Sequence, residues 1–390
     1  MRINDGISSL SAGTLSQLIK LVSKKSMELS LYIYVYENYC IAYLPWDSSV
    51  LWIVTFLGVD FFYYWFHRGS HEINLFWASH QTHHSSEDYN LTTALRQSAI
   101  AGPIIALFYL PLALFVPPPV YLVHKQFNLL FQFWIHTELI DNLGPLEYVL
   151  NTPSHHRVHH GRNPYCIDRN YAGTLIIWDR MFGTFVKEKP DEVIAYGHVH
   201  PINTFNPIFV QTGHLRNLVT RCWNIKGLWN KICVVIKGPG WNPGSPWCGN
   251  PEDIPPIESP MKIYDRKVPH WLNVYGVIHY LVLLPMYECL MHNRLTLPGY
   301  IIVLDVAFFL LSLSSLGFLF DKKPFAYPIE FLRCTFSAVL LYIFRDNIEQ
   351  PHNLPSVLIS LVIAIYASSA FLLITIHQLH PKEKQTKKVN

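Results

Sequence analysis

The chain has 390 residues, of which 50% are hydrophobic and only 15% are charged, whereas soluble domains carry about 25% charged residues. The composition therefore favours an integral membrane protein. A net charge of +3, with no basic stripe of interleaved aromatics, argues against a nucleic-acid partner. The seven cysteines are scattered without a CxxC pair, which argues against a disulfide framework or a cysteine zinc site.

The N-terminal region, residues 1–48, is predicted to be a polar arm followed by an interfacial helix. Residues 1–26 are mostly polar and have none of the features of a cleavable signal peptide. Residues 27–44 are apolar but interrupted by Glu28 and Glu37, which favours a helix that is interfacial or partly buried. Membrane insertion is therefore expected to depend on internal helices.

Residues 49–237 are interpreted as one domain that combines membrane helices with a polar part. Residues 51–66 are predicted to be a membrane helix that leads directly to His67. Two further apolar runs, 98–116 and 120–134, are predicted to form a helical hairpin around the prolines between them. Residues 135–237 are more polar and are expected to face water on the side where the hairpin returns.

The remaining chain is predicted to be a linker, four membrane helices and a tail. Of the twenty-three residues from 238 to 260, eleven are Gly or Pro, which indicates an irregular ordered linker, placed at 238–268. A C-terminal membrane region at 269–380 follows, because four runs approach the roughly 20 apolar residues that cross a bilayer core. These runs are residues 270–291, 299–320, 326–344 and 354–376.

Lysines predict the orientation of these helices. The tail at 381–390 has four lysines and the turn at 321–324 has two, and cytoplasmic segments are enriched in Lys and Arg. After four crossings, the tail and the polar part of the domain lie on the same side, so both are expected to be cytosolic. The final KKVN also resembles a dilysine retrieval signal of endoplasmic-reticulum membrane proteins.

Three histidine groups suggest a metal centre. Their members are spaced so that they share a helix face: His67 and His71; His80, His83 and His84; His156, His159 and His160. A single pair with this spacing is usually a coincidence on a surface helix, but three groups with this spacing in one chain are not expected by chance. A zinc site takes three or four protein ligands and leaves half of these rings unused, so two metal ions are the simplest interpretation.

Other polar residues near these groups have two interpretations each. His136 is a candidate ninth ligand or an ordinary interfacial histidine, and His155 lies off the shared face. Glu72 is a candidate catalytic carboxylate that bridges metals, orients an imidazole or moves protons, or else a solvated residue. Asp60 lies two turns before His67, where an intramembrane acid tends to be functional, although a hydrogen-bonding role is also open.

A second set of polar residues flanks the histidine groups. These residues are candidates to bind the glycerol or the pterin, although helix caps and salt bridges are the favoured interpretation: Asn90, Arg96, Arg157, Arg162 and Asn163. Histidines outside the groups, such as His198, His200, His214 and His279, are isolated in the sequence and are interpreted as structural.

The spacing of the three groups resembles the fatty acid hydroxylase/sterol desaturase superfamily, whose signature is HX(3 or 4)H, HX(2 or 3)HH and (H/Q)X(2 or 3)HH. Here the boxes are HRGSH, HQTHH and HRVHH. The strings FLGVDFFYYWFHRGSHE, WASHQTHHSSEDYNLTTALRQS, TPSHHRVHHGRNPYCIDRNYAG and KGPGWNPG are similar to the alkylglycerol monooxygenase family in particular. Relatives usually carry another membrane helix before the part that begins here at Arg2, so an N-terminally short form is expected.

The resemblance implies an all-α integral membrane protein, a multi-pass helical bundle with a cytosolic histidine-rich diiron domain. It implies two iron ions held by the box histidines, a tetrahydrobiopterin cofactor, O2 and an ether-lipid substrate in the endoplasmic-reticulum bilayer. The expected reaction hydroxylates the carbon next to the ether oxygen and cleaves the O-alkyl bond to give a fatty aldehyde and a glycerol derivative. It also implies that Glu72 corresponds to the family's glutamate beside the first box. The pterin-binding residues and the oligomeric state stay open.

Two alternatives remain at this point. One is a sterol or fatty-acyl hydroxylase or desaturase of the same superfamily that receives electrons from cytochrome b5. The other, from a different class, is a membrane protein that binds or transports metal without catalysis, which would distribute polar residues through its membrane helices. Here the histidines instead gather at one boundary.

Overall fold

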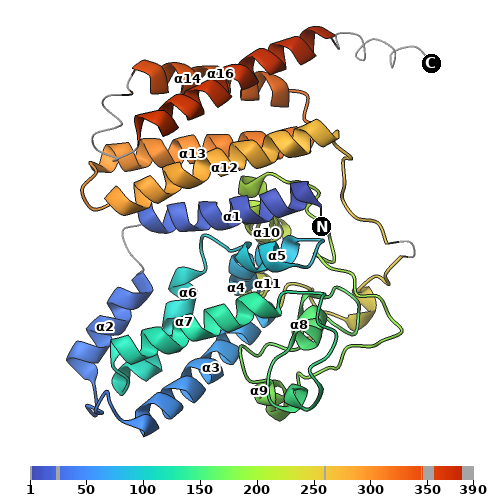
Figure 1. Cartoon of the computed structure of the whole chain (residues 1–390). Coiled ribbons are helices and arrows are strands. Elements are labelled where there is room, and N and C mark those ends of the chain that lie inside the picture. Colours follow the sequence, from blue (N-terminus) through green and yellow to red (C-terminus); the bar gives the residue numbers. More distant parts are fainter. Residues whose placement is uncertain (1, 23–26, 259–260, 344, 346–354, 380–390) are drawn as a thin grey trace. The chain divides into compact units, whose positions relative to one another are not determined.

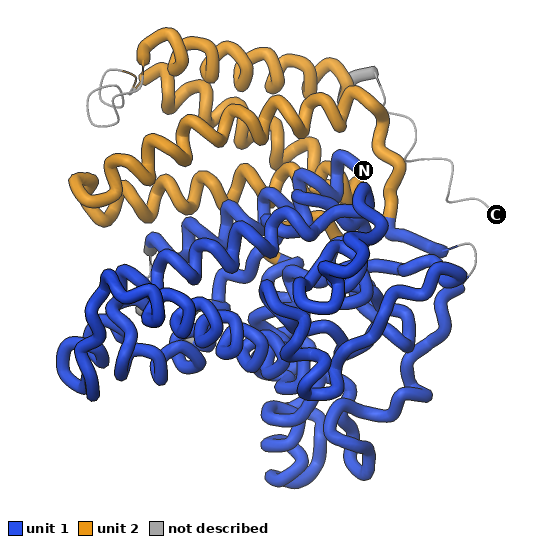
Figure 2. Tube along the Cα trace, turned by 60° about the horizontal axis from the view of Figure 1, so that its bottom comes forward, with its two compact units in different colours: residues 1–203, 209–264 blue, residues 204–208, 265–390 orange. Residues whose placement is uncertain are grey.

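The computed structural model describes residues 2–22, 27–258, 261–343, 345 and 355–379. Over these residues the chain is helical, with no β-strand and two isolated β-bridges. It divides into two compact units, which Figure 2 shows in different colours: residues 1–203 with 209–264, and residues 204–208 with 265–390. The predicted C-terminal tail, with its lysines, lies outside the described residues.

Over its described residues, the first unit contains eleven α-helices and four short 3-10 helices. Figure 1 labels the α-helices. The α-helices are α1 (Ile3–Val22), α2 (Met27–Tyr39), α3 (Ser49–Glu72), α4 (Asn74–His80), α5 (Leu91–Leu95), α6 (Gly102–Tyr109), α7 (Pro118–Ile135), α8 (Pro153–His160), α9 (Ile177–Phe182), α10 (Pro207–Asn224, counted here from 209) and α11 (Leu228–Ile236). The 3-10 helices are η1 (His83–Ser85), η2 (Leu110–Leu114), η3 (Gly144–Tyr148) and η4 (Pro251–Asp253).

Helix α3 carries the first histidine box, His67 and His71, near its C-terminal end. Ser48 caps its N-terminus by accepting a hydrogen bond from the backbone N–H of Leu51. Its 24 residues are long and apolar enough to cross a membrane. The helix continues past the predicted end at Phe66, so that His67 and His71 lie on its last two turns.

The predicted membrane hairpin at 98–134 was partly wrong. Residues 98–116 do not form one long helix, because α6 ends at Tyr109 and the tighter η2 follows, with Pro111 near its start. Pro111 has no N–H to donate to the preceding turn, so it interrupts the α-helical ladder. The apolar helical part spans Ile104–Leu114, which is too short to count as a span. The second arm does form one helix, α7.

Helix α2 packs against this interrupted segment, which agrees with a partly buried helix. The ring of Tyr32 stacks on that of Tyr121 at a centroid distance of 4.1 Å, and its hydroxyl donates to the carbonyl of Val116. Leu51 and Val59 of α3 belong to the same apolar core. The exposed positions of α2 include Tyr34 and Tyr39.

Residues 1–26, interpreted above as an arm, contain a 20-residue helix, α1. It packs on α5, and Gly13 allows the close approach, because a Cβ at this position would overlap the carbonyl oxygen of Leu95. Asp5 of α1 forms an ion pair with Arg96, and both side chains are buried. The pattern of polar and apolar residues in this serine-rich segment did not predict these contacts.

The second unit contains four long helices: α12 (His270–Asn293), α13 (Gly299–Phe320), α14 (Ala326–Ile343) and α16 (Ser356–Leu379). Each contains a stretch apolar enough to cross a membrane, so with α3 the described residues hold 5 candidate spans. The four runs predicted as C-terminal membrane helices are thus helical in the structure and are long and apolar enough to cross a membrane. A core of apolar side chains from these helices, including Val282, Cys334 and Tyr366, joins them.

Candidate metal centre

Nine histidines gather in the first unit as two adjoining groups. The first group consists of His67, His71, His80, His84 and His159, and the second of His83, His136, His156 and His160. Within each group, ligand-type nitrogen atoms from all members lie within 4.8 Å of one another. The side chains come from α3, the α4–η1 segment, the end of α7, and α8.

The two groups do not correspond to the boxes in the sequence. Helix α4 ends at His80, and a turn at Gln81 and Thr82 precedes the 3-10 helix that carries His83 and His84. His84 joins His80 in the first group, whereas His83 belongs to the second. On α8, His159 likewise belongs to the first group while His156 and His160 belong to the second. Each of the last two boxes therefore contributes to both groups.

Backbone carbonyls fix the tautomers of four rings. The Nδ1 atoms of His67 and His159 lie 2.8 Å and 2.9 Å from the carbonyl oxygens of Tyr171 and Arg169. Likewise, Nδ1 of His83 and of His136 lie 3.2 Å and 2.6 Å from the carbonyl oxygens of Arg96 and Gln132. A carbonyl can only accept, so Nδ1 carries the proton in each ring and Nε2 is left with a lone pair.

The Nε2 atoms face one another at short distances. Those of His83 and His136 lie 3.2 Å apart although neither carries a proton. In the first group, Nε2 of His80 lies 3.0 Å from that of His67 and 3.1 Å from that of His84. Two lone pairs cannot hydrogen-bond to each other, so the facing Nε2 atoms of His83 and His136 fit a cation between them. Convergent neutral imidazoles are a donor set that suits iron, and the residues therefore fit a metal.

Burial keeps these rings neutral. Loss of hydration lowers the pKa of His83 to about 4 and lowers the pKa of His80, His84 and His136 well below the usual value. The same cause lowers the pKa of the three histidines of α8 in the groups. A neutral ring with a free Nε2 is the metal-binding form of histidine, so protons do not compete with a metal at neutral pH.

The structure distinguishes the two histidines that stood outside the boxes. His136 lies in the second group, with Nε2 3.2 Å from Nε2 of both His156 and His160. His155 belongs to neither group: it is buried, and its Nε2 lies 3.9 Å from the carboxylate of Glu147. The carboxylate of Glu147 also accepts hydrogen bonds from Thr152 and Ser154 at the start of α8.

Two buried carboxylates hold the loop that orients His67. Asp60 of α3 accepts hydrogen bonds from the backbone N–H groups of Thr174 and Leu175. Asp179 accepts from the N–H of Tyr171 and of Ala172, and desolvation raises the pKa of Asp179 to about 6. Asp60 therefore anchors the loop rather than bonding an imidazole. Asp179 was missed because it lies more than a hundred residues from His67 in sequence.

Glu72, the predicted catalytic carboxylate, lies at the edge of the centre. Its Oε1 accepts a hydrogen bond of 2.8 Å from Arg68, one turn earlier on α3. The hydroxyl of Tyr171 lies 3.5 Å from the same oxygen. Glu72 is not a member of either histidine group. A different carboxylate, that of Asp168, lies 3.7 Å from Nδ1 of His71.

Most of the flanking polar residues are structural, as the favoured interpretation predicted. Arg96 pairs with Asp5, and Asn90 caps α5 as part of a capping box. Arg157 pairs with Glu188, and Asn163 bonds Glu192 and the 193–195 backbone. Arg162 differs from these four, because it also lines a cavity in front of the histidines.

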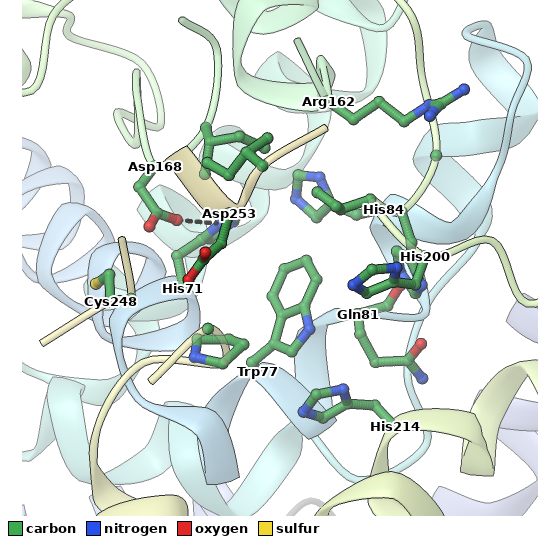
Figure 3. Close-up of a pocket in the computed structure, with 18 of the residues that line it drawn as sticks. His71, Trp77, Gln81, His84, Arg162, Asp168, His200, His214, Cys248 and Asp253 are labelled. Carbon is green, nitrogen blue, oxygen red and sulfur yellow. Dashed lines mark hydrogen bonds and ion pairs between the residues drawn. The ribbon is translucent and has the colours of Figure 1, made fainter. Parts of the chain in front are cut away.

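This cavity has a volume of about 760 Å³ and reaches both histidine groups. His71, His84 and His159 of the first group line it, as does His160 of the second. Figure 3 shows Trp77 lying among the side chains of His71, His84, Gln81 and His214. The side-chain oxygen of Gln81 is buried and has no hydrogen-bond partner within the described structure. The cavity therefore offers a ligand access to the centre.

Three histidines interpreted as isolated also line the cavity: His198, His200 and His214. Nε2 of His198 lies 2.6 Å from the backbone carbonyl oxygen of Gln81, and Nε2 of His214 lies 2.5 Å from Oδ1 of Asn74. Residues of the Gly/Pro-rich linker, among them Cys248 and Asp253, complete the wall. Their sequence positions gave no signal for this site, since no spacing links them to the boxes.

Comparisons with known proteins bear on what such a centre does. A family described as fatty acid hydroxylase matches residues 52–184, and one described as alkylglycerol monooxygenase C-terminal domain matches residues 272–359. Alkylglycerol monooxygenase of Xenopus tropicalis is 57% identical over 90% of this chain and 76% of its own length. The chain belongs to the alkylglycerol monooxygenase family.

Further members of the alkylglycerol monooxygenase family agree with this assignment. The human protein is 54% identical over 85% of this chain and 74% of its own length, and that of Caenorhabditis elegans is 41% identical over 87% and 70%. No solved structure has significant similarity to the chain. The chain is therefore a membrane-bound oxygenase, and a non-catalytic metal carrier is excluded.

Proposed function

We propose that the chain is a diiron, tetrahydrobiopterin-dependent monooxygenase that cleaves the O-alkyl bond of alkylglycerols and ether lipids. The observation that carries the proposal is the pair of buried histidine groups, with five and four rings, in a member of this family. One oxygen atom of O2 enters the C–H bond beside the ether oxygen. Two electrons from the reduced pterin, with two protons, convert the other atom to water, and the hemiacetal collapses to a fatty aldehyde and a glycerol derivative.

Each histidine group would hold one iron ion. The ligand set is His67, His71, His80, His84 and His159 for one ion and His83, His136, His156 and His160 for the other. Bound iron supplies the redox chemistry with O2 that zinc lacks. The protein residues keep the imidazoles neutral by burial and orient them through the carbonyls of Tyr171, Arg169, Arg96 and Gln132.

The cavity is the proposed place for the polar reactants. A reduced pterin presents several N–H donors on a planar ring, and the carboxylate of Asp168, which lines the cavity, is an acceptor for them. Trp77 supplies an aromatic surface in the same cavity. Burial of the histidines excludes bulk water from the reacting atoms, while the alkyl tail stays among the apolar helices.

Glu72 is proposed to move a proton at the edge of the centre. Its Oε1 faces both the guanidinium of Arg68 and the hydroxyl of Tyr171, and the ring of Tyr171 lies 5.3 Å from that of His71. A proton could therefore pass between Glu72 Oε1 and the Tyr171 hydroxyl without crossing open water. Collapse of the hemiacetal needs a proton to leave its hydroxyl and another to reach the glycerol oxygen.

The cellular setting is part of the proposal. The lysines of the 321–324 turn and the tail favour a cytosolic histidine centre, and the KKVN end favours the endoplasmic reticulum. We assign residues 1–48 to the N-terminal region, 49–237 to the catalytic domain, 238–268 to the linker, 269–380 to the membrane region and 381–390 to the tail. A soluble pterin would then reach the cavity from the cytosol.

The proposal is tested on the detergent-purified full chain by metal analysis and an aldehyde assay. We expect two iron ions per chain and fatty aldehyde formation from an alkylglycerol that requires reduced pterin. Adding reduced cytochrome b5 in place of pterin separates this function from that of a sterol or acyl-chain hydroxylase. His83→Ala should abolish aldehyde formation while the protein still inserts into membranes.

The matched control for this variant is His270→Ala. His270 begins α12 and is exposed, far from either histidine group in sequence. The control should keep both its iron and its activity. Normal turnover by the His83→Ala variant, or by protein that contains no iron, would contradict the proposed function.

A further inference from the structure

Helices α10 and α11 form a basic hairpin in the first unit. From residue 207 to 237 the chain contains no Asp or Glu, whereas it contains Arg216, Arg221, Lys226, Lys231 and Lys237. The charge is therefore of one sign along the whole hairpin. Such a surface is complementary to an anionic partner.

The hairpin also exposes large apolar side chains. Leu215, Val219 and Trp223 follow one another at intervals of four residues on α10, so they share a face. Val219 is 60% exposed and Trp223 is 83% exposed. At the start of α11, Leu228 is 76% exposed and Trp229 is 68% exposed. These residues extend the apolar face around the turn between the helices.

The opposite side of the hairpin is packed. Leu218 of α10 and Cys233 and Val234 of α11 form a small buried core with Trp241 of the linker. Arg221 donates hydrogen bonds to the backbone carbonyls of Pro239 and Trp241. The apolar residues on the outer face are thus held outward by a well-packed hairpin and are not the ends of a frayed helix.

The hairpin is attached at the end of a membrane helix. Asn74, two residues after α3 ends, donates from its backbone N–H to the carbonyl of Lys237 and from Nδ2 to the carbonyl of Val234, each at 2.7 Å. The indole of Trp247 donates to the carbonyl of Glu72, the last residue of α3. Helix α3 is long and apolar enough to cross a membrane, so its C-terminal end is expected where hydrocarbon meets water. Val234 and Lys237, at the end of the hairpin, contact the chain at that point.

We propose that the α10–α11 hairpin lies in the membrane interface and binds anionic lipid headgroups. Trp223, Leu228 and Trp229 would enter the boundary between headgroups and acyl chains, where tryptophan is favoured. Lys226 and Lys231 would stay at the level of the phosphates, since an anionic lipid surface attracts basic residues near it. Of the possible partners, a lipid surface fits best, because aromatic and basic residues alternate here and acidic ones are absent.

The hairpin would also place the cavity close to the lipid surface. His214 and Asn217, on another face of α10, line the cavity in front of the histidines. A lipid with its headgroup at the interface would therefore have a short route to the centre. This consequence rests on the proposed function, whereas membrane contact of the hairpin does not depend on which reaction the centre performs.

The test uses tryptophan fluorescence of the full chain in vesicles of phosphatidylcholine and phosphatidylserine. Subtracting the emission of a double variant, Trp223→Phe with Trp229→Phe, isolates the signal of these two side chains among the 11 tryptophans. We expect phosphatidylcholine brominated high on its acyl chains to quench more than half of this difference signal. Acrylamide added to the water should quench little of it.

A second variant tests the role of charge. Lys226→Glu with Lys231→Glu should lower the lipid quenching at least two-fold when phosphatidylserine is present, whereas Lys187→Glu, an exposed lysine outside the hairpin, should not. Strong quenching by acrylamide alone would show the hairpin in water. Quenching by neither agent would show it covered by protein, such as a second copy of the chain. Either result overturns the proposal, and neither bears on the aldehyde assay.

Discussion

The carboxylate of Asp168 lies 3.7 Å from Nδ1 of His71, whose other ring nitrogen, Nε2, is buried with no hydrogen-bond partner in the described structure. Asp168 reaches this position with a left-handed backbone, φ 57°. Such a conformation costs a non-glycine residue free energy and is often found at functional sites. A carboxylate behind a metal-binding histidine holds the ring in place and makes it a better ligand.

Replacing Asp168 should weaken metal binding without unfolding the protein. Asp168→Asn tolerates the same backbone but carries no charge, and it should lower iron affinity by about 10- to 100-fold. Iron content after dialysis against a chelator measures the effect directly. Asp191→Asn, an exposed aspartate in the same unit, is the control and should retain iron like the unaltered chain. Equal retention by both variants would remove Asp168 from the metal centre.

His136 should behave as a ligand although it lies outside the three boxes. His136→Ala removes one of the four rings of the second group, so iron content should fall by about half, because metal binding depends on a complete donor set. Aldehyde formation should be lost with it. His155→Ala provides the contrast, since His155 pairs with Glu147 and belongs to neither group. A His136→Ala enzyme with two irons would refute the assignment.

Asp60 should determine the stability of the loop that orients His67. Asp60→Ala leaves the N–H groups of Thr174 and Leu175 and the indole of Trp178 without their acceptor. Each buried donor left unpaired costs about 1–3 kcal/mol, so the apparent Tm in detergent should fall clearly. Trp178→Phe removes only one donor together with its hydrogen bond and should lower the Tm much less. Similar Tm values for the two variants would argue against the anchoring role.

The ion pair between Glu330 and Arg333 should be critical in the second unit. Both side chains are buried, and Glu330 also accepts hydrogen bonds from Tyr275 and Ser315. Breaking a buried pair by removing one partner typically costs about 3–5 kcal/mol, so Glu330→Gln should lower the apparent Tm strongly.

The size of this effect is judged against two further variants. The double variant, Glu330→Gln with Arg333→Met, should lose less stability than the sum of its single changes, because no unpaired charge remains. Glu288→Gln, at an exposed position of α12, should have little effect. Thermal unfolding of the purified chain checks all of these, and additive losses would show that the two side chains act independently.

Gly13 should tolerate no side chain. In Gly13→Ala the new methyl group would overlap the Leu95 carbonyl and push α1 away from α5. Gly6, on the same helix, has only an ordinary contact with Thr92, so Gly6→Ala should be neutral or slightly stabilising. Limited proteolysis of the first unit compares them: only Gly13→Ala should speed cleavage near α1. Equal cleavage of both variants would mean that α1 adapts to the methyl group.

Much of the fold could be predicted because membrane helices are encoded locally. A run such as 299–320 is apolar over its whole length. Because the hydrocarbon core of a bilayer contains no water, such a segment satisfies its backbone hydrogen bonds by forming an α-helix. The failure at 98–116 has a local cause as well, since the run is apolar but Pro111 interrupts its helical ladder. Apolar composition alone does not reveal such a break.

The sequence by itself determined that imidazoles would gather at the end of an apolar helix, because His67 and His71, four residues apart, share a face at the end of α3. Only the tertiary structure decided how the rings are shared between two groups, that His136 joins the second, and that Asp60, Asp168 and Asp179 support them. The physical reason is distance along the chain. Helical spacing fixes the direction of neighbouring side chains, whereas contacts such as that between Asp60 and Thr174 exist only after separate helices have packed.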